Sequence, residues 1–278
     1  MEIQELKQTL QNIGTVGAGG AGFPTYAKLD ERAEIILMNC AECEPLLKLH
    51  RQLLEQRAED ILRAFDRIAQ TVGAKEAIIG IKREYKATLK AIDRYIDAYP
   101  NMRVQLLDGA YPMGDEVVLI YEATGRVIRP GGLPIEEGVA VFNVETVYNV
   151  YRGMENSTPV IDKLVTVVGE VEHPITVRVP LGASIKDVIA YAGETTTKNP
   201  VYLIGGSMMG NLADETAVVT KTTNAVIVLD KSHSLVRRKN RNAAIDLKRA
   251  ASSCCQCETC TSLCPRHALG HPIEPHKF

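Results

Sequence analysis

The chain has 278 residues, which is long enough for two or three domains around a sizeable core. Its net charge of −2 gives no electrostatic case for nucleic acid or an anionic membrane as a partner. No apolar run approaches the roughly 18 residues of a membrane-spanning helix, and the polar first residues do not resemble a signal peptide. We therefore expect a cytoplasmic protein without direct membrane insertion, which would reach a membrane complex only through partner subunits.

Buried strands and amphipathic helices alternate along the first half of the chain. Apolar runs of strand length are followed by apolar residues at helical spacing. This alternation predicts an α/β domain with a largely parallel sheet, which we place at residues 1–158. Strands are expected over 33–39, 76–82, 103–108 and 138–144, and helices over 3–12, 46–74, 85–99, 114–125 and 145–154.

A second, smaller unit follows. Residues 163–180 contain two β-rich runs around a turn, which predicts a hairpin. A short helix with Ser184 as its N-cap comes next, and then a strand over 200–206. Strand–strand–helix–strand within one short stretch is typical of an inserted α+β domain of the β-grasp kind, which we place at residues 159–215.

The chain then leads from this unit toward its cysteine-rich end. A strand over 223–230 is a candidate to return to the first domain. Residues 216–240 are therefore expected to be a return strand and linker. A single basic helix is expected over 235–251, directly before the cysteines.

Five of the seven cysteines lie between Cys254 and Cys264, which indicates metal chemistry in a reducing compartment. The spacing Cys254-x2-Cys257-x2-Cys260-x3-Cys264, followed by proline, is typical of bacterial ferredoxins and predicts a [4Fe–4S] cluster. Zinc is the alternative, but zinc modules usually pair two knuckles across a longer gap. In two-cluster ferredoxins the fourth cysteine ligates the other cluster, so Cys264 completes this cluster or serves a second one. We expect residues 241–278 to be an incomplete helical iron–sulfur segment.

The first glycine-rich loop contains Gly17, Gly19 and Gly22 at G-x-G-x-x-G spacing. A Rossmann fingerprint follows a strand and opens a helix. Here the preceding residues are helical and the first strand begins only at residue 33, so that interpretation fails. The glycines still permit close backbone approach, and their N–H groups can face a phosphate or a flat ring.

Polar residues gather near the same loop and at the end of the first strand. Lys28 follows the glycines, and Asn39, Glu42 and Glu44 follow the first strand. In open α/β sheets, ligands bind at the carboxyl ends of the strands. The alternative is that the two glutamates are solvated turn residues and Lys28 is a surface lysine.

Five motifs occur in a characteristic order: "GAGGAGFPTYAKL", "NCAECEP", "YPMGDE", "GGLP" and "NVET". Together they resemble the flavin-binding subunit of respiratory complex I and, more closely, its RnfC-type relatives. The resemblance extends over nearly the whole chain and includes the β-grasp (SLBB) unit and the cysteine motif. Alanines at positions 18 and 41 and phenylalanine at position 142 depart from the complex I pattern and fit the RnfC side.

The resemblance implies a Rossmann-like domain that binds FMN and NADH. Phe23 and Glu44 match positions that contact the nicotinamide nucleotide. The positions that match the FMN cradle are Gly17, Gly19, Gly20, Gly22, Lys28, Asn39, Glu42, Cys43, Tyr111, Gly114, Asp115, Glu116 and Asn143. The resemblance also implies that the chain works with other redox subunits.

The mechanism expected from this family is hydride transfer from C4 of NADH to N5 of FMN, with no side-chain acid or base. Single electrons then leave through the [4Fe–4S] cluster to a partner. The alternative function is a relay or scaffold subunit that has lost NADH binding. Cys40 and Cys43 form C-x2-C, which could indicate a thiol redox pair, but a role for Cys43 in the pocket wall is favoured.

Overall fold

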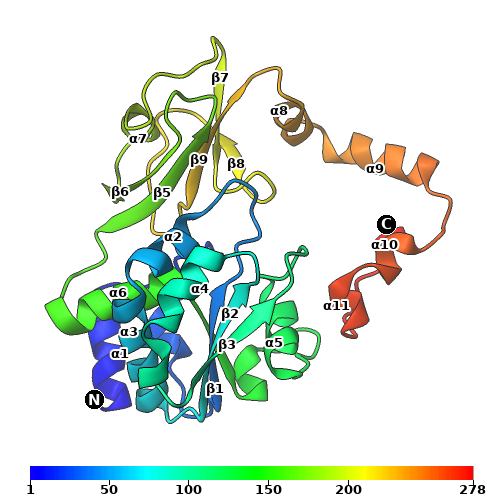
Figure 1. Cartoon of the computed structure of the whole chain (residues 1–278). Coiled ribbons are helices and arrows are strands. Elements are labelled where there is room, and N and C mark those ends of the chain that lie inside the picture. Colours follow the sequence, from blue (N-terminus) through cyan, green and yellow to red (C-terminus); the bar gives the residue numbers. More distant parts are fainter. Residues whose placement is uncertain (278) are drawn as a thin grey trace.

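The computed structural model describes residues 1–277 and contains two sheets followed by a helical arm (Figure 1). The strands are β1 (Ile35–Cys40), β2 (Glu76–Lys82), β3 (Met102–Leu107), β4 (Val139–Asn143), β5 (Asp162–Gly169), β6 (Ile175–Pro180), β7 (Pro200–Ile204), β8 (Asn211–Ala213) and β9 (Ala225–Asp230). The α-helices are α1 (Ile3–Asn12), α2 (Leu49–Gln56), α3 (Ala58–Val72), α4 (Lys86–Asp93), α5 (Glu116–Thr124), α6 (Val144–Asn156), α7 (Ile185–Ala190), α8 (Ser234–Lys239), α9 (Ala243–Ser253), α10 (Thr259–Ser262) and α11 (Pro265–Ala268). Short 3-10 helices are η1 (Thr25–Lys28), η2 (Ile96–Ala98), η3 (Pro134–Glu137) and η4 (Pro275–Lys277).

Two helices expected to be continuous are each divided in two. The helix expected over 46–74 breaks at Arg57, whose backbone is non-helical, into α2 and α3. The helix expected over 235–251 breaks before Asn242, whose side chain accepts a hydrogen bond from the N–H of Ala244 and so caps a new helix, α9. An asparagine side chain that bonds nearby backbone competes with helix continuation, which helical spacing alone does not reveal.

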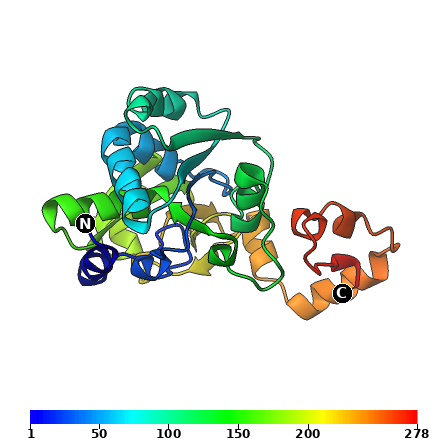
Figure 2. The same ribbon diagram turned by 90° about the horizontal axis from the view of Figure 1, so that it is seen from below.

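The first sheet is parallel, as expected, with strand order β3-β2-β1-β4. Helices α1, α3 and α6 pack on one face and α5 packs on the other (Figures 1 and 2). The side chains of β1 alternate between these two cores, because Ile36 and Met38 face the first while Ile35 and Leu37 face the second. After β1 the chain builds outward through β2 and β3 and then places β4 on the opposite side of β1. The order therefore reverses between β1 and β4.

The second sheet has strand order β6-β5-β9-β7-β8. The expected hairpin is present as antiparallel β5 and β6, and Ser184 caps α7 by accepting a hydrogen bond from the N–H of Asp187 at 3.1 Å. The strand expected to return to the first domain does not do so. It is β9, the central strand of this second sheet, paired with β5 on one side and β7 on the other. Its run of buried apolar residues suits a strand that is covered on both faces of its sheet, with Val226 and Val228 in one core and Ala225 and Ile227 in the other.

A buried ionic contact and an apolar cluster join the two domains. The ammonium group of Lys163 on β5 is paired with the carboxylate of Glu145 on α6 and also bonds the side-chain oxygen of Asn224 at 2.8 Å. Lys163 is only 1% exposed. The apolar cluster contains residues of both domains: Leu47, Leu49, Leu203, Ala225 and Ile227.

The last residues form an arm that leaves the second domain and reaches the side of α5 (Figure 1). No residue of α9 is buried. The arm is held to the first domain where Arg266 of α11 donates to Asp115 at 2.6 Å and a ring nitrogen of His271 lies 2.9 Å from the carbonyl oxygen of Ile128. Within residues 1–277, no helix combines the length and apolar character that crossing a bilayer would require.

Candidate cofactor pocket

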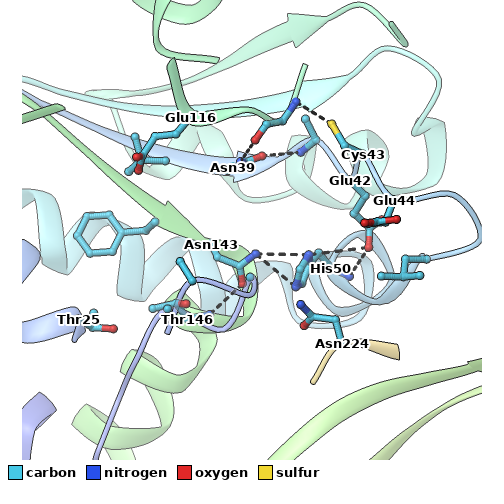
Figure 3. Close-up of a pocket in the computed structure, with 18 of the residues that line it drawn as sticks. Thr25, Asn39, Glu42, Cys43, Glu44, His50, Glu116, Asn143, Thr146 and Asn224 are labelled. Atoms are coloured by element: carbon cyan, nitrogen blue, oxygen red, sulfur yellow. Dashed lines mark hydrogen bonds and ion pairs between the residues drawn. The ribbon is translucent and has the colours of Figure 1, made fainter. Parts of the chain in front are cut away.

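The main candidate site lies where the first sheet reverses its strand order. Asn39 at the end of β1 is paired in register with Asn143 at the end of β4, so both side chains stand at the same sheet edge. A pocket of about 300 Å³ opens there, between this edge, the glycine-rich loop and the start of α2 (Figure 3). Ligand sites of open α/β sheets are expected at such a switch point, because the connections on either side run in opposite directions and leave a crevice.

The glycine-rich loop forms a compact turn against α6. The N–H of Gly17 donates to the carbonyl of Phe23 at 2.8 Å, and the N–H of Gly22 donates to the carbonyl of Gly17 at 3.1 Å. The N–H of Ala18 donates to Thr146 Oγ1 at 2.9 Å and ties the loop to α6. The loop follows a helix, α1, and leads into a 3-10 turn, so it is not a dinucleotide fingerprint of strand–turn–helix type.

Gly114 is held tightly between two other elements of the pocket. Asn39 Nδ2 donates to the Gly114 carbonyl at 2.9 Å, and the Gly114 N–H donates to Cys43 Sγ at 3.0 Å. A Cβ at this position would lie 2.1 Å from the carbonyl oxygen of Ala41, a distance no side chain can occupy. The glycine therefore allows the "YPMGDE" and "NCAECEP" segments to close around one pocket.

The inner end of the pocket is formed by Glu42 and His50, which are nearly removed from solvent. Glu42 Oε1 accepts a hydrogen bond from the N–H of His50 at 2.9 Å, and Arg51 Nε lies 3.6 Å from the other carboxylate oxygen. Burial raises the pKa of Glu42, an effect that Arg51 opposes. Burial, together with the charge of Lys163, lowers the pKa of His50 to about 3. The imidazole is thus neutral at physiological pH.

One cation faces the other side of the pocket. Lys28 Nζ donates to the carbonyl of Val141 at 2.8 Å and lies 3.7 Å from Glu116 Oε1. Asn143 is the N-cap of α6, because its Oδ1 accepts two hydrogen bonds from the first turn of that helix. Its Nδ2 lies 3.3 Å from His50 Nε2. Lysine and the N-terminal end of a helix both favour an anionic group.

Ten of the fifteen predicted cofactor residues line this pocket. They are Gly17, Gly19, Lys28, Asn39, Glu42, Cys43, Glu44, Gly114, Glu116 and Asn143. Gly20, Gly22, Phe23, Tyr111 and Asp115 are not in its lining. Phe23 and Tyr111 are 48% and 60% exposed, and Gly20 and Gly22 have φ values of +124° and +66° that shape the turn.

Asp115 has a local role that accounts for its place outside the pocket. Its Oδ1 accepts from the N–H groups of Val117 and Val118, so it is the N-cap of α5, and its carboxylate pairs with Arg266. An aspartate directly before an apolar helix is itself a capping signal in the sequence.

Several lining residues were not foreseen from the sequence. Among them are Thr25, Leu47, His50, Thr146 and Asn224. His50 and Asn224 reach the pocket from the start of α2 and from the second domain. Thr25 and Thr146 lie inside two of the five family motifs, which were the signal that could have indicated them, whereas Asn224 reaches the pocket only through the packing of the second domain.

The lining of the pocket combines one cation, Lys28, with the carboxylates of Glu42, Glu44 and Glu116, and this mixture suits a cofactor such as FMN, which carries hydroxyl and N–H groups as well as a phosphate. Thr25 is a lining residue, and its buried hydroxyl has no hydrogen-bond partner within the described part of the chain. Lys28 supplies a positive charge. Gly19 has no side chain, and a Cβ there would lie only 3.1 Å from Asn143 Nδ2, so the glycine keeps this part of the pocket open. An unsatisfied buried hydroxyl at the pocket wall points to a ligand that would complete it.

The cysteines differ between the two ends of the chain. Cys40 is fully buried and burial raises its pKa, which disfavours a redox pair with Cys43. Cys254, Cys257 and Cys260 are exposed and Cys264 is partly exposed. Within residues 1–277 no three His, Cys, Asp or Glu side chains converge on a metal position. The four thiols suit an iron–sulfur cluster in chemical type, while their placement here does not form its cage.

Comparison with known proteins places this pocket in a family. A family model described as the Nuo51 FMN-binding domain matches residues 10–152, and an SLBB domain model matches residues 164–212. Cobalamin reductase PduS of Salmonella typhimurium is 42% identical over 278 residues, which cover 99% of this chain and 61% of that protein. The chain therefore spans about three fifths of this relative.

Two further similar proteins belong, by their names, to an oxidoreductase complex and to a hydrogenase. One component of the Na(+)-translocating ferredoxin:NAD(+) oxidoreductase complex of Acetobacterium woodii is 29% identical over 96% of this chain and 59% of its own length. A chain of the NAD+-reducing [NiFe]-hydrogenase in its air-oxidised state superimposes with a TM-score of 0.72 and 25% identity, over 84% of this chain and 47% of that one. A pocket at the β1–β4 switch point and a matching domain over residues 10–152 lead to one conclusion: the chain belongs to the Nuo51 FMN-binding family, joined to an SLBB domain.

Proposed function

We propose that this chain is an electron-input subunit that binds FMN in the β1–β4 pocket, oxidises NADH there and delivers electrons to a partner redox protein. The observation that carries the proposal is the convergence of ten family positions, from four separate segments, on one pocket at the switch point of the sheet. Membership of the Nuo51 FMN-binding family and the oxidoreductase names of the relatives support it.

The residues of this chain would orient and enclose the cofactor. FMN, when bound, supplies the hydride-accepting ring. Lys28 and the capped start of α6 favour its phosphate, while Asn39 and Gly114 hold the wall together. The uncharged His50 keeps a polar but neutral wall next to Asn143. No side chain has to exchange a proton with the substrate, because hydride transfer needs orientation and exclusion of water rather than acid–base catalysis.

The flavin and NADH parts of the proposal are tested by spectroscopy under anaerobic conditions. The purified protein reconstituted with FMN should show a bound-flavin spectrum at one FMN per chain, and NADH should bleach it. Absence of stoichiometric FMN would refute the flavin site. A bound flavin that NADH leaves unchanged, but dithionite bleaches, would refute NADH oxidation and retain the flavin site.

We further propose that Cys254, Cys257, Cys260 and Cys264 hold a [4Fe–4S] cluster that conducts single electrons to the partner. The ferredoxin spacing of these residues supports this proposal, and cluster binding would have to draw together the four thiols, which do not converge in this structure. After anaerobic purification, iron and sulfide analysis should give four of each per chain. Zinc in place of iron would refute it. The variant Cys255→Ser, outside the motif register, is the matched control for Cys257→Ser, which should lose the cluster.

A second candidate is a relay or scaffold subunit that does not use NADH. The favouring observation is that Phe23, one of two residues matched to the nucleotide, is 48% exposed and lies outside the pocket lining. This function requires that NADH fail to bleach the flavin while reduced ferredoxin or another one-electron donor succeeds.

A further inference from the structure

A loop of the second domain binds the side chain of Glu44, a residue of the candidate pocket, through two backbone hydrogen bonds. The loop consists of residues 205–210, between β7 and β8. Glu44 Oε2 accepts a hydrogen bond from the backbone N–H of Met208 at 2.9 Å, and its Oε1 accepts from the N–H of Met209 at 2.7 Å. Two consecutive amides thus bind the two oxygens of one carboxylate and determine its plane.

Gly206 allows the loop to approach Glu44, and Lys239 fixes the backbone of the loop. A Cβ on Gly206 would lie 1.8 Å from Cδ and 2.0 Å from Oε2 of Glu44, so only glycine allows the loop to approach so closely. Lys239, on α8, donates to the carbonyl oxygens of Met208 and Gly210 at 3.2 and 2.5 Å. The ammonium group thereby orients the Met208–Met209 peptide, whose N–H group donates to Glu44 Oε1.

Glu44 also lines the pocket of the first domain and is half-buried rather than covered. A carboxylate has about four acceptor positions, and the loop takes two of them. The loop leaves the remaining lone pairs unused. A side chain held in this way is preorganised, because its rotamer freedom has already been lost before a ligand arrives.

We propose that Gly206 and Lys239 are positioning residues, which hold the Glu44 carboxylate in place so that it accepts hydrogen bonds from a ligand at the pocket mouth. A carboxylate repels phosphate and accepts from hydroxyl or amide N–H groups, so the part of the ligand it meets is a ribose or a carboxamide. This inference rests on the proposed function, since NADH carries both groups. The second domain is then part of the pocket rather than an appendage.

The test is steady-state NADH oxidation with an artificial electron acceptor, using the FMN-loaded protein. Gly206→Ala should displace the carboxylate and raise KM for NADH about tenfold, the loss expected for one hydrogen bond to a charged group, with kcat and FMN content unchanged. Lys239→Met should act in the same direction. Ser207→Ala, in the same loop but leaving both amide groups in place, is the matched control and should behave like the wild type.

A double-mutant cycle shows whether the loop acts through Glu44. Glu44→Ala alone should also raise KM, and adding Gly206→Ala to it should have little further effect, because the side chain being positioned is gone. An unchanged KM in Gly206→Ala, or the same rise with and without Glu44, would overturn the proposal. Equal losses of kcat and flavin would indicate a merely structural role and would overturn it as well.

Hydrogen exchange separates this inference from the proposed function. The amides of Met208 and Met209 should exchange slowly in the wild type and much faster in Glu44→Ala, whether or not NADH is a substrate. If NADH fails to bleach the wild-type flavin, the proposed function fails and the exchange result still decides whether the loop holds Glu44. Equal exchange rates in the two proteins would refute the contact itself.

Discussion

At the scale of single residues, Gly114 is the position where the pocket tolerates least change. A Cβ there would meet the backbone carbonyl of Ala41 at 2.1 Å and Cys43 Sγ at 2.9 Å, and a backbone oxygen cannot rotate away as a side chain can. Gly114→Ala should therefore open the pocket wall, lose most bound FMN and lower the free energy of unfolding by about 1–3 kcal/mol.

The matched control for this prediction is Gly109→Ala in the same connection. Its Cβ would meet only the carboxylate of Glu84, an exposed side chain that can move. FMN titration and urea unfolding should leave this variant close to the wild type. Full flavin content in Gly114→Ala would show that the close approach of the two segments is not needed for cofactor binding.

His50 should make the stability of the protein sensitive to mild acid. Its pKa is about 3 in the folded state and near 6.5 in an unfolded chain, so protons bind the unfolded state first as pH falls below 6.5. Stability is fully present above pH 6.5 and is lost progressively toward pH 3. Between pH 8 and pH 5 the expected loss from this residue is about 2 kcal/mol.

Comparison with His50→Gln isolates this effect in urea unfolding at pH 8 and pH 5. The raised pKa of Glu42 has the opposite effect on stability as pH falls, because protonating a buried carboxyl relieves its desolvation. This effect of Glu42 is the same in the wild type and in the variant. The variant should lose less stability than the wild type on acidification. Parallel losses would mean that the imidazole is not buried in its neutral form.

At the scale of elements, Asp115 connects the start of α5 to the C-terminal arm. Asp115→Ala removes the N-cap and the partner of Arg266, and should lower stability by about 1 kcal/mol while releasing α11. Arg266→Gln removes only the ion pair, so it should release α11 with little effect on unfolding. Limited trypsin digestion reports the release. Equal stability loss in both variants would contradict the assignment of the cap.

The elements of the first domain follow from local patterns, whereas one element of the second does not. Alternating strand-like and helical runs predicted the four parallel strands, and Ser184 begins α7 as its N-cap, as expected. The strand at 225–230 was misassigned because its continuous apolar run suits the centre of either sheet. Register with β5 and β7, which no local pattern encodes, decides between them.

At the scale of the whole molecule, the Lys163–Glu145 pair should be the most sensitive contact between the domains. Lys163→Met leaves the carboxylate of Glu145 buried without its partner and should lower the free energy of unfolding by about 3–5 kcal/mol. Glu145→Gln added to it removes the unpaired charge and keeps an acceptor for the N–H of Leu164, so it should restore part of the loss. Urea unfolding of both variants measures this. Full stability of Lys163→Met would show that the pair does not hold the domains together.

The sequence by itself determined the parallel α/β domain, the exclusion of a dinucleotide fingerprint at the glycine loop and the ferredoxin spacing of the cysteines. Each of these depends on residues close together in the chain. The tertiary structure decided that His50 and Asn224 reach the pocket, that Asp115 pairs with Arg266 of the arm, and that the loop at 205–210 binds Glu44. These contacts join residues up to 165 positions apart. Periodicity predicts which face of an element is buried, but the partner that buries it is chosen only when the whole chain packs.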